Sequence, residues 1–165
     1  MVRLLIVYDS RTGGARQMAT AAAEGGRGDG DGACEISLKF APDAGPQDLL
    51  SADGYIFAAP ENLAAISGRM KDFFDRSYYP ALGRIEGRPY ALMVCAGSDG
   101  ENAVRQMARI ATGWRLKEAQ APMIVCTHAQ TPEQILAPKT IGDADLALCR
   151  ELGAAMAAGL ALGVF

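Results

Sequence analysis

The sequence predicts a doubly wound α/β fold, a three-layer sandwich in which helices cover both faces of a five-stranded parallel sheet. Segments typical of strands alternate with segments typical of helices along the 165 residues. Most of the strand segments are apolar on both faces, as expected for a parallel sheet that helices bury. Five strands suit the order 2-1-3-4-5, in which ligands bind beyond the carboxyl ends of the strands.

The expected strands are runs rich in apolar and β-branched residues. They span Arg3–Tyr8, Cys34–Leu38, Gly54–Ala59, Tyr90–Cys95 and Met123–Cys126. The expected helices span Gly14–Glu24, Ser67–Tyr79, Glu101–Trp114 and Asp143–Leu162, with a short helix at Gly45–Leu50. The last helix has an apolar residue at every third or fourth position, which indicates packing against the core. Two segments are expected to be loops, the glycine-rich residues 25–32 and residues 131–142.

Composition limits the classes of function. The net charge of −3 provides no global basic field for nucleic acid, and 165 residues suit a single domain over residues 1–165. The longest low-charge stretch, residues 152–165, is shorter than the ~20 apolar residues that a membrane span needs. The N-terminus lacks the pattern of a secretory leader, so we expect a cytoplasmic protein. The four cysteines are widely spaced, which favours free thiols over a metal site.

The turn after the first expected strand has the features of a phosphate-binding turn. It consists of Ser10, Arg11, Thr12, Gly13, Gly14 and Ala15. A helix that starts here offers unpaired N–H groups and partial positive charge. The glycines allow close approach of the backbone to a ligand, the hydroxyls can donate hydrogen bonds, and Arg11 and Arg16 add charge. The same pattern also fits a plain strand–helix turn with a Ser/Thr cap.

Two further loops are expected at the same edge of the sheet, because the carboxyl ends of parallel strands lie together. One begins at Ala58 and runs to Gly68, and the other spans Cys95–Asn102. Both are rich in small and polar residues that expose backbone N–H and C=O groups. Beside a phosphate turn, such loops suit a flat heteroaromatic ring that carries a phosphorylated tail.

The pattern strand–S-x-T-G–helix, together with one longer motif, resembles the flavodoxin superfamily. The longer motif consists of Pro60, Ser67-Gly68, Met70-Lys71, Phe73-Phe74 and Asp75-Arg76. The sequence is most similar to the flavodoxin-like NAD(P)H-dependent FMN reductases and quinone reductases, from the first strand to the last helix. The resemblance implies a flavodoxin-like fold, FMN as the cofactor, and NAD(P)H and a small electron acceptor as partners.

The resemblance also implies roles for individual residues. The first turn, Ser10–Ala15, would hold the FMN phosphate. Two sets would flank the isoalloxazine ring: Pro60, Glu61, Asn62 and Leu63 on one side, and Ala96, Gly97, Ser98 and Gly100 on the other. No acid–base residue is required, because the flavin carries the redox chemistry. Lys71 and Arg76 are expected to be structural or solvated.

Two departures from the family pattern bear on function. Gly14 and Ala15 stand where the family often has Asn and Thr, so one hydroxyl donor to the phosphate is missing. Such a bond is worth about 1.5–3 kcal/mol, which Arg11 or Arg16 could offset. Neither ring-flanking loop contains an aromatic residue, and the chain is not strongly acidic. Dedicated flavodoxin carriers usually stack aromatic residues on the flavin ring and are strongly acidic. The absence of both features, which leaves the ring open, therefore favours a reductase.

The expected function is therefore an FMN-binding oxidoreductase that passes electrons from NAD(P)H through FMN to a quinone or another small acceptor. Two alternatives stay open. One is a flavodoxin-type electron-transfer protein without its own NAD(P)H activity, and the other is a flavodoxin-fold binding module that has lost its cofactor. His128 is more simply a loop residue than a proton shuttle. Tyr78 and Tyr79 are expected to pack in the core or against a second subunit, which allows a homo-oligomer.

Overall fold

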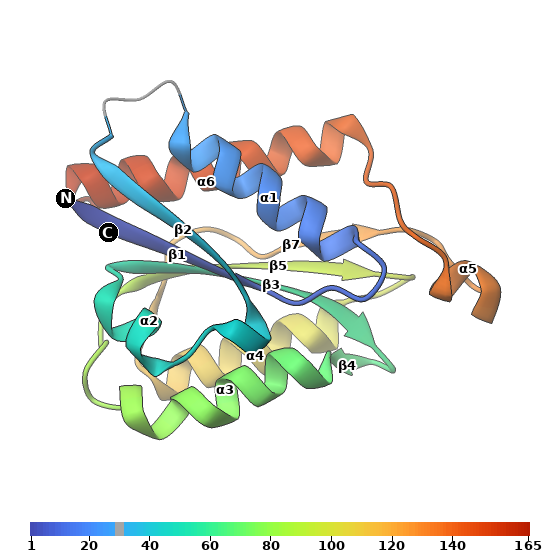
Figure 1. Cartoon of the computed structure of the whole chain (residues 1–165), viewed down its shortest axis with the longest axis horizontal. Coiled ribbons are helices and arrows are strands. Elements are labelled where there is room, and N and C mark those ends of the chain that lie inside the picture. Colours follow the sequence, from blue (N-terminus) through green and yellow to red (C-terminus); the bar gives the residue numbers. More distant parts are fainter. Residues whose placement is uncertain (29–31) are drawn as a thin grey trace.

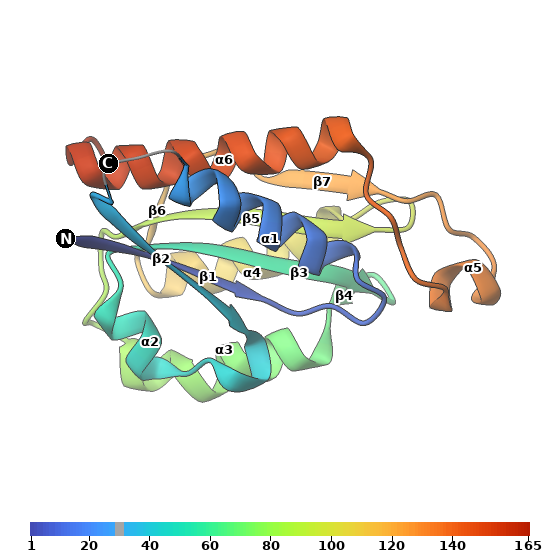
Figure 2. The ribbon, with the colours of Figure 1, turned by 45° about the horizontal axis from the view of Figure 1, so that its top comes forward.

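Helices cover both faces of a parallel sheet in the computed structural model, which describes residues 1–28 and 32–165. Helices α1 (Gly14–Arg27) and α6 (Asp143–Leu162) cover one face (Figures 1 and 2). The other face is covered by α2 (Pro46–Ser51), α3 (Gly68–Ala81) and α4 (Glu101–Gly113). The three-layer flavodoxin-like sandwich expected from the sequence is confirmed.

The central strands have the order β2-β1-β3-β5, and all of these pairs are parallel. The strands are β1 (Val2–Tyr8), β2 (Cys34–Phe40), β3 (Gly54–Asn62) and β5 (Pro89–Ala96). Two short strands, β6 (Lys117–Glu118) and β7 (Met123–Cys126), pair with the start and the end of β5. The predicted order 2-1-3-4-5 is confirmed, with β7 as the fifth strand. The edge strand is interrupted before Pro122, which has no N–H to donate to the ladder.

The core has two parts because successive side chains of a strand point to opposite faces. Leu4 and Ile6 of β1 pack in the layer under α1 and α6. Leu5 and Val7 pack in the layer over α2, α3 and α4, where aromatic side chains gather. Trp114 is buried there, and its indole N–H donates to the carbonyl of Tyr78 at 2.9 Å. In the described part of the chain, no helix combines the length and the apolar character needed to cross a membrane.

Helix α1 continues into the segment expected to be a loop. Gly25, Gly26 and Arg27 are helical, while Asp29–Asp31 of the same expected loop lie outside the described residues. A Cβ on Gly25 would collide with the carbonyl group of Arg150, and one on Gly153 would collide with that of Ala22. The glycines therefore allow α1 and α6 to touch backbone to backbone, and this packing outweighs their low helix propensity.

Two other segments differ from the sequence expectation. Strand β3 extends past Ala59 to Asn62 and pairs antiparallel with β4 (Ala65–Ile66). Helix α5 (Pro132–Leu136) lies within the expected loop 131–142 and projects from the body of the protein (Figure 1). Thr131 and Gln134 form a capping box at its start, and Pro132 is its first residue. This T-P-x-Q pattern is a helix-start signal that the sequence analysis overlooked.

Candidate functional site

The first turn leads from β1 into α1 at the carboxyl edge of the sheet (Figure 1). Gly13 caps α1 with φ of 95°, in the left-handed region that favours glycine. The Gly13 N–H donates to Ser10 Oγ at 3.1 Å, which leaves the Ser10 hydroxyl hydrogen free to donate. The next three N–H groups, of residues 14–16, have no acceptor among the described residues. The turn therefore presents free donors and the positive end of a helix dipole.

Packing explains why Gly14 and Ala15 replace larger polar residues. A Cβ on Gly14 would collide with Cys95 Sγ on β5, and Ala15 is only 2% exposed. Both residues can meet a ligand through their backbone N–H groups only. Burial raises the pKa of the Cys95 thiol to about 11, so this thiol stays neutral beneath the turn at physiological pH.

The second predicted segment forms a β-hairpin rather than a loop. Pro60, Glu61 and Asn62 are the last residues of β3, and Leu63 begins the turn that leads to β4. Leu63 and Ala64 have φ of 50° and 62°, which makes a tight two-residue connection. Pairing of Glu61 with Ile66 and of Asn62 with Ala65 holds the hairpin together. The Leu63 side chain is fully exposed at its tip.

The third segment follows β5. Ala96 is the last residue of that strand, its side chain is buried, and its carbonyl accepts a hydrogen bond from Thr127 N–H. Gly97 and Ser98 come next and are accessible. Gly100 caps α4 with φ of 90°, and a Cβ there would lie 2.8 Å from Ile124. Ala96 and the buried Gly100 thus anchor the two ends of the segment, and Gly97 and Ser98 between them are accessible to a ligand.

Hydrogen bonds join the second and third segments at this edge of the sheet and tie the first turn to the segment after α5. Glu61 Oε2 accepts the N–H of Gly100 at 2.8 Å, which links the hairpin to the start of α4. Asn102 donates to the carbonyl of Ala64 between the same two elements. The backbone N–H of Lys139 donates to the Thr12 carbonyl at 2.8 Å and so ties the first turn to the segment after α5. The structure therefore brings the sequence-predicted residues together, while their contacts with a ligand stay a prediction.

Sequence reasoning missed the role of Asp9. Its side chain is 1% exposed, and Arg69 Nε lies 2.9 Å from Asp9 Oδ1. Arg69 Nη2 also donates to the Ser10 carbonyl at 2.9 Å, and the guanidinium lies 5.0 Å from the centre of the Phe40 ring. The sequence did contain a signal for this role, namely a carboxylate directly after a buried strand. A charge at such a position is expected to be buried, and a buried charge requires a partner.

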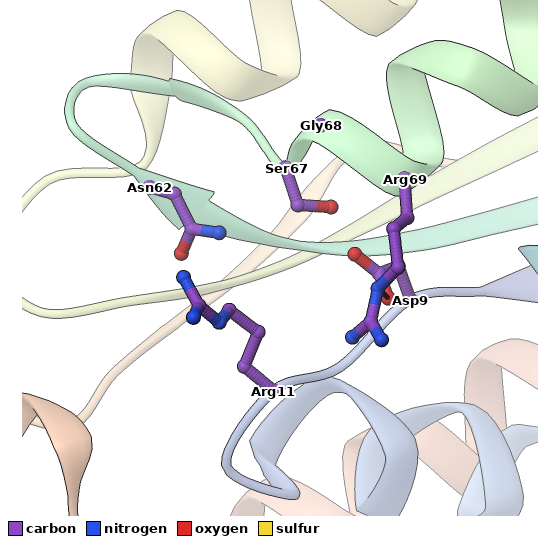
Figure 3. Close-up of a pocket in the computed structure, with 6 residues that line it drawn as sticks. All are labelled: Asp9, Arg11, Asn62, Ser67, Gly68 and Arg69. Carbon is purple, nitrogen blue, oxygen red and sulfur yellow. Dashed lines mark ion pairs between the residues drawn. The ribbon is translucent and has the colours of Figure 1, made fainter.

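Two cavities flank the first turn. One has a volume of about 320 Å³ and lies between the turn and the start of α3 (Figure 3). Its lining consists of Asp9, Arg11, Asn62, Ser67, Gly68 and Arg69. The other, of about 350 Å³, is lined by Tyr8, Ser10, Thr12, Gly13, Arg16 and Phe40. Four of the residues predicted to bind phosphate therefore face open space beside the turn, namely Ser10, Arg11, Thr12 and Gly13, whereas Gly14 and Ala15 are buried.

The cations of α3 divide into two groups. Lys71 forms an exposed ion pair with Asp75, one helical turn away. Arg76 donates to the carbonyls of Ala41 and Ala44, near the 3₁₀ turn Ala41–Asp43. These contacts confirm the structural or solvated roles expected of Lys71 and Arg76. Arg69, at the start of the same helix, belongs instead to the site.

A parallel sheet in this order, with a glycine-capped turn that leads from its first strand into a helix, defines the flavodoxin-like class of α/β proteins. Residues 29–130 match the sequence model of the family described as NADPH-dependent FMN reductase. The match spans more than half of the chain, and the chain belongs to this family.

Curated relatives carry two kinds of name. The chain is 36% identical over 110 residues to a flavodoxin of Aquifex aeolicus, and the match covers 66% of this chain and 58% of that protein. It is 29% identical over 150 residues to an NAD(P)H dehydrogenase (quinone) of Brucella ovis, which covers 78% of this chain and 73% of that protein. The chain thus spans less than two thirds of the flavodoxin relative.

Solved structures share the fold at low sequence identity. An archaeal flavodoxin superposes with a TM-score of 0.76 and 17% identity, over 96% of this chain and 99% of that one. A flavodoxin, WrbA-like protein from Agrobacterium tumefaciens superposes with a TM-score of 0.69 and 20% identity, over 99% of both chains. Similarity at this level of identity establishes the fold alone.

Proposed function

We propose that this chain binds FMN at the carboxyl edge of its sheet and transfers electrons from NAD(P)H through the flavin to a quinone or another small acceptor. The family to which the chain belongs is named for FMN, and family membership implies this cofactor. The first turn is the observation that carries the proposal. It combines free N–H groups, a free hydroxyl hydrogen and a helix N-terminus.

The residues present fit the phosphate of FMN. The hydroxyls of Ser10 and Thr12 and the first N–H groups of α1 would hold it, and Gly13 lets the backbone approach closely. Arg11 and Arg16 are exposed beside the turn and would offset the phosphate charge. Because Gly14 and Ala15 contribute only N–H groups, the side-chain contribution is expected to depend on Ser10 and Thr12.

The flavin ring would lie between the hairpin tip and the segment after β5. Pro60–Leu63 would flank one side of it, and Gly97, Ser98 and Gly100 the other. The Glu61–Gly100 hydrogen bond fixes the separation of these two segments without any ligand. Neither segment contributes an aromatic side chain, so a nicotinamide or a quinone could reach the ring. When bound, FMN supplies the hydride and electron transfer, and the protein positions it.

The test is an absorption spectrum with added FMN, followed by an assay of NADH and NADPH oxidation with a quinone acceptor. We expect a yellow protein that consumes at least one of the two nicotinamides. Protein that stays colourless with added FMN would contradict the proposal and favour a binding module. FMN uptake without NAD(P)H consumption would favour an electron-transfer protein, as the name of the Aquifex aeolicus relative suggests.

A further inference from the structure

The cavity between the first turn and α3 contains polar groups that lack partners. Asp9 and Ser67 line it, and each is 1% exposed. Arg69 offsets the charge of Asp9, but neither carboxylate oxygen accepts a well-directed hydrogen bond within the described structure, and Ser67 Oγ has no partner either. Buried polar groups are normally satisfied, so these two side chains call for a ligand that donates hydrogen bonds.

The same cavity is also suited to an anion. Arg11 and Arg69 bring two positive charges against the one negative charge of Asp9. Arg11 forms no ion pair with any described residue, and its guanidinium points across the cavity toward Asn62 (Figure 3). The first N–H groups of α3 also lack acceptors among the residues that the structure describes, and the Ser67 side chain does not cap this helix.

A phosphorylated sugar satisfies both requirements in one ligand. Sugar hydroxyls donate to carboxylates, as in the contact of an Asp or Glu with ribose that dinucleotide-binding sites use. A guanidinium binds phosphate through paired hydrogen bonds. The volume of about 320 Å³ suits one phosphorylated ribose better than a whole dinucleotide.

We propose that this cavity binds a phosphate-bearing ribose of the nicotinamide dinucleotide, with Asp9 and Ser67 contacting the sugar hydroxyls and Arg11 the phosphate. The inference rests on the proposed function, which supplies a ligand of this chemistry. It extends that function because the cavity adjoins the predicted flavin site, with which it shares Arg11 and Asn62. Ser67 then acts as a determinant of dinucleotide binding.

The test measures ligand binding to FMN-loaded protein by isothermal titration calorimetry. Nicotinamide mononucleotide and adenosine 2′-monophosphate serve as the two probes, since each carries a phosphorylated ribose from one half of NADPH. Binding of the first assigns the cavity to the nicotinamide half, and binding of the second to the 2′-phosphoadenosine half. Binding of either probe supports the proposal, provided that Ser67→Ala weakens the binding of that probe.

Ser67→Ala has a matched control in Ser77→Ala. Ser77 lies on α3, which begins directly after Ser67. It is fully buried, its Oγ has no hydrogen-bond partner among the described residues, and it does not line the cavity. We expect Ser67→Ala to raise the Kd of the bound probe by up to about tenfold, as for loss of one hydrogen bond to a sugar hydroxyl, and Ser77→Ala to leave it unchanged. The KM for the dinucleotide should rise more than kcat falls in Ser67→Ala. Thermal unfolding checks that both variants fold.

Three results would overturn the inference. They are failure of both probes to bind, equal behaviour of Ser67→Ala and Ser77→Ala, and a loss of FMN affinity in Ser67→Ala as large as the loss of probe affinity. The last result would assign the cavity to the flavin itself. If the unmodified protein oxidises NAD(P)H and Ser67→Ala changes neither the Kd of the probe nor the KM for the dinucleotide, this inference is overturned while the proposed function stands. Failure of the unmodified chain to bind FMN or to oxidise NAD(P)H overturns the proposed function as well.

Discussion

The guanidinium of Arg69 lies 2.9 Å from the buried carboxylate of Asp9 and joins the start of α3 to the end of β1. Arg69 also donates to the carbonyl of Ser10, the next residue of the first turn. One side chain therefore holds the carboxylate and the backbone of the turn that is proposed to bind phosphate. The position of this turn depends on an element that lies far from it in the sequence.

Replacing Arg69 is expected to destabilise the protein. Arg69→Gln leaves the Asp9 carboxylate buried without its counter-ion, and because Arg69 itself is half exposed, we expect a loss of about 1–3 kcal/mol in the free energy of unfolding. Urea unfolding measures it. The control is Lys71→Gln, which breaks an exposed pair and should cost less than about 0.5 kcal/mol. Adding Asp9→Asn to Arg69→Gln should recover part of the lost stability, because no buried charge then remains. Equal losses of stability in Arg69→Gln and Lys71→Gln would contradict the expectation.

Removal of the Ser10 hydroxyl is expected to weaken FMN binding. Ser10→Ala deletes a hydroxyl that is free to donate to the phosphate, and the loss of a bond to a charged group should raise the Kd for FMN about tenfold or more. Quenching of flavin fluorescence measures this Kd. Ser51→Ala is the control, since Ser51 is exposed at the end of α2 and its hydroxyl donates to the nearby Asp48 carbonyl at 3.1 Å. An unchanged Kd in Ser10→Ala would remove the side-chain support for the proposed phosphate site.

A larger residue at Gly153 is expected to force α1 and α6 apart. Alanine is intrinsically favoured over glycine in a helix by about 1 kcal/mol. Its Cβ would nevertheless collide with the carbonyl of Ala22, so we expect Gly153→Ala to destabilise the protein by about 1–3 kcal/mol. Thermal unfolding is the measurement. Gly142→Ala, where a Cβ meets nothing within 4 Å, should change the stability less. A stabilised Gly153→Ala variant would show that the helices separate easily.

Stability is expected to fall above pH 9. Burial raises the pKa of Cys95 from 9.0 to about 11 and that of Cys149 from 9.0 to about 12. At a pH between 9.0 and the raised pKa of each thiol, the folded chain keeps a proton that the unfolded chain loses. The free energy of unfolding therefore decreases as the pH rises. Each thiol contributes at most about 1.4 kcal/mol per pH unit. Burial also raises the pKa of Tyr55 and Tyr90, which adds to the trend.

Urea unfolding at a series of pH values from 8 to about 11 tests this dependence. The double variant Cys95→Ala/Cys149→Ala keeps the tyrosines and should show a smaller decrease. A slope that is the same in the double variant and in the unmodified protein would mean that the two thiols titrate alike in the folded and unfolded chains.

Local patterns account for most of the fold that could be predicted. The alternation of strands and helices and the apolar stripe of α6 follow from periodicities of a few residues, and the structure confirms them. The strand order was expected from the fold class that this alternation indicates, and it is confirmed as well. The errors lie where longer-range packing prevails over local preference. Gly25 and Gly26 are typical of a loop, but contact with α6 keeps them helical. Past Ala59, pairing with β4 extends β3 into an expected loop.

The sequence by itself determined the layered fold and the position of the first turn, because both depend on residues that are neighbours in the chain. Only the tertiary structure decided that Asp9 meets Arg69, that Glu61 holds Gly100, and that Gly14 packs on Cys95. These contacts join residues from different elements, so they depend on which strands are adjacent and how the helices cover them. Burial of Asp9 and Ser67 in one cavity follows from the same arrangement.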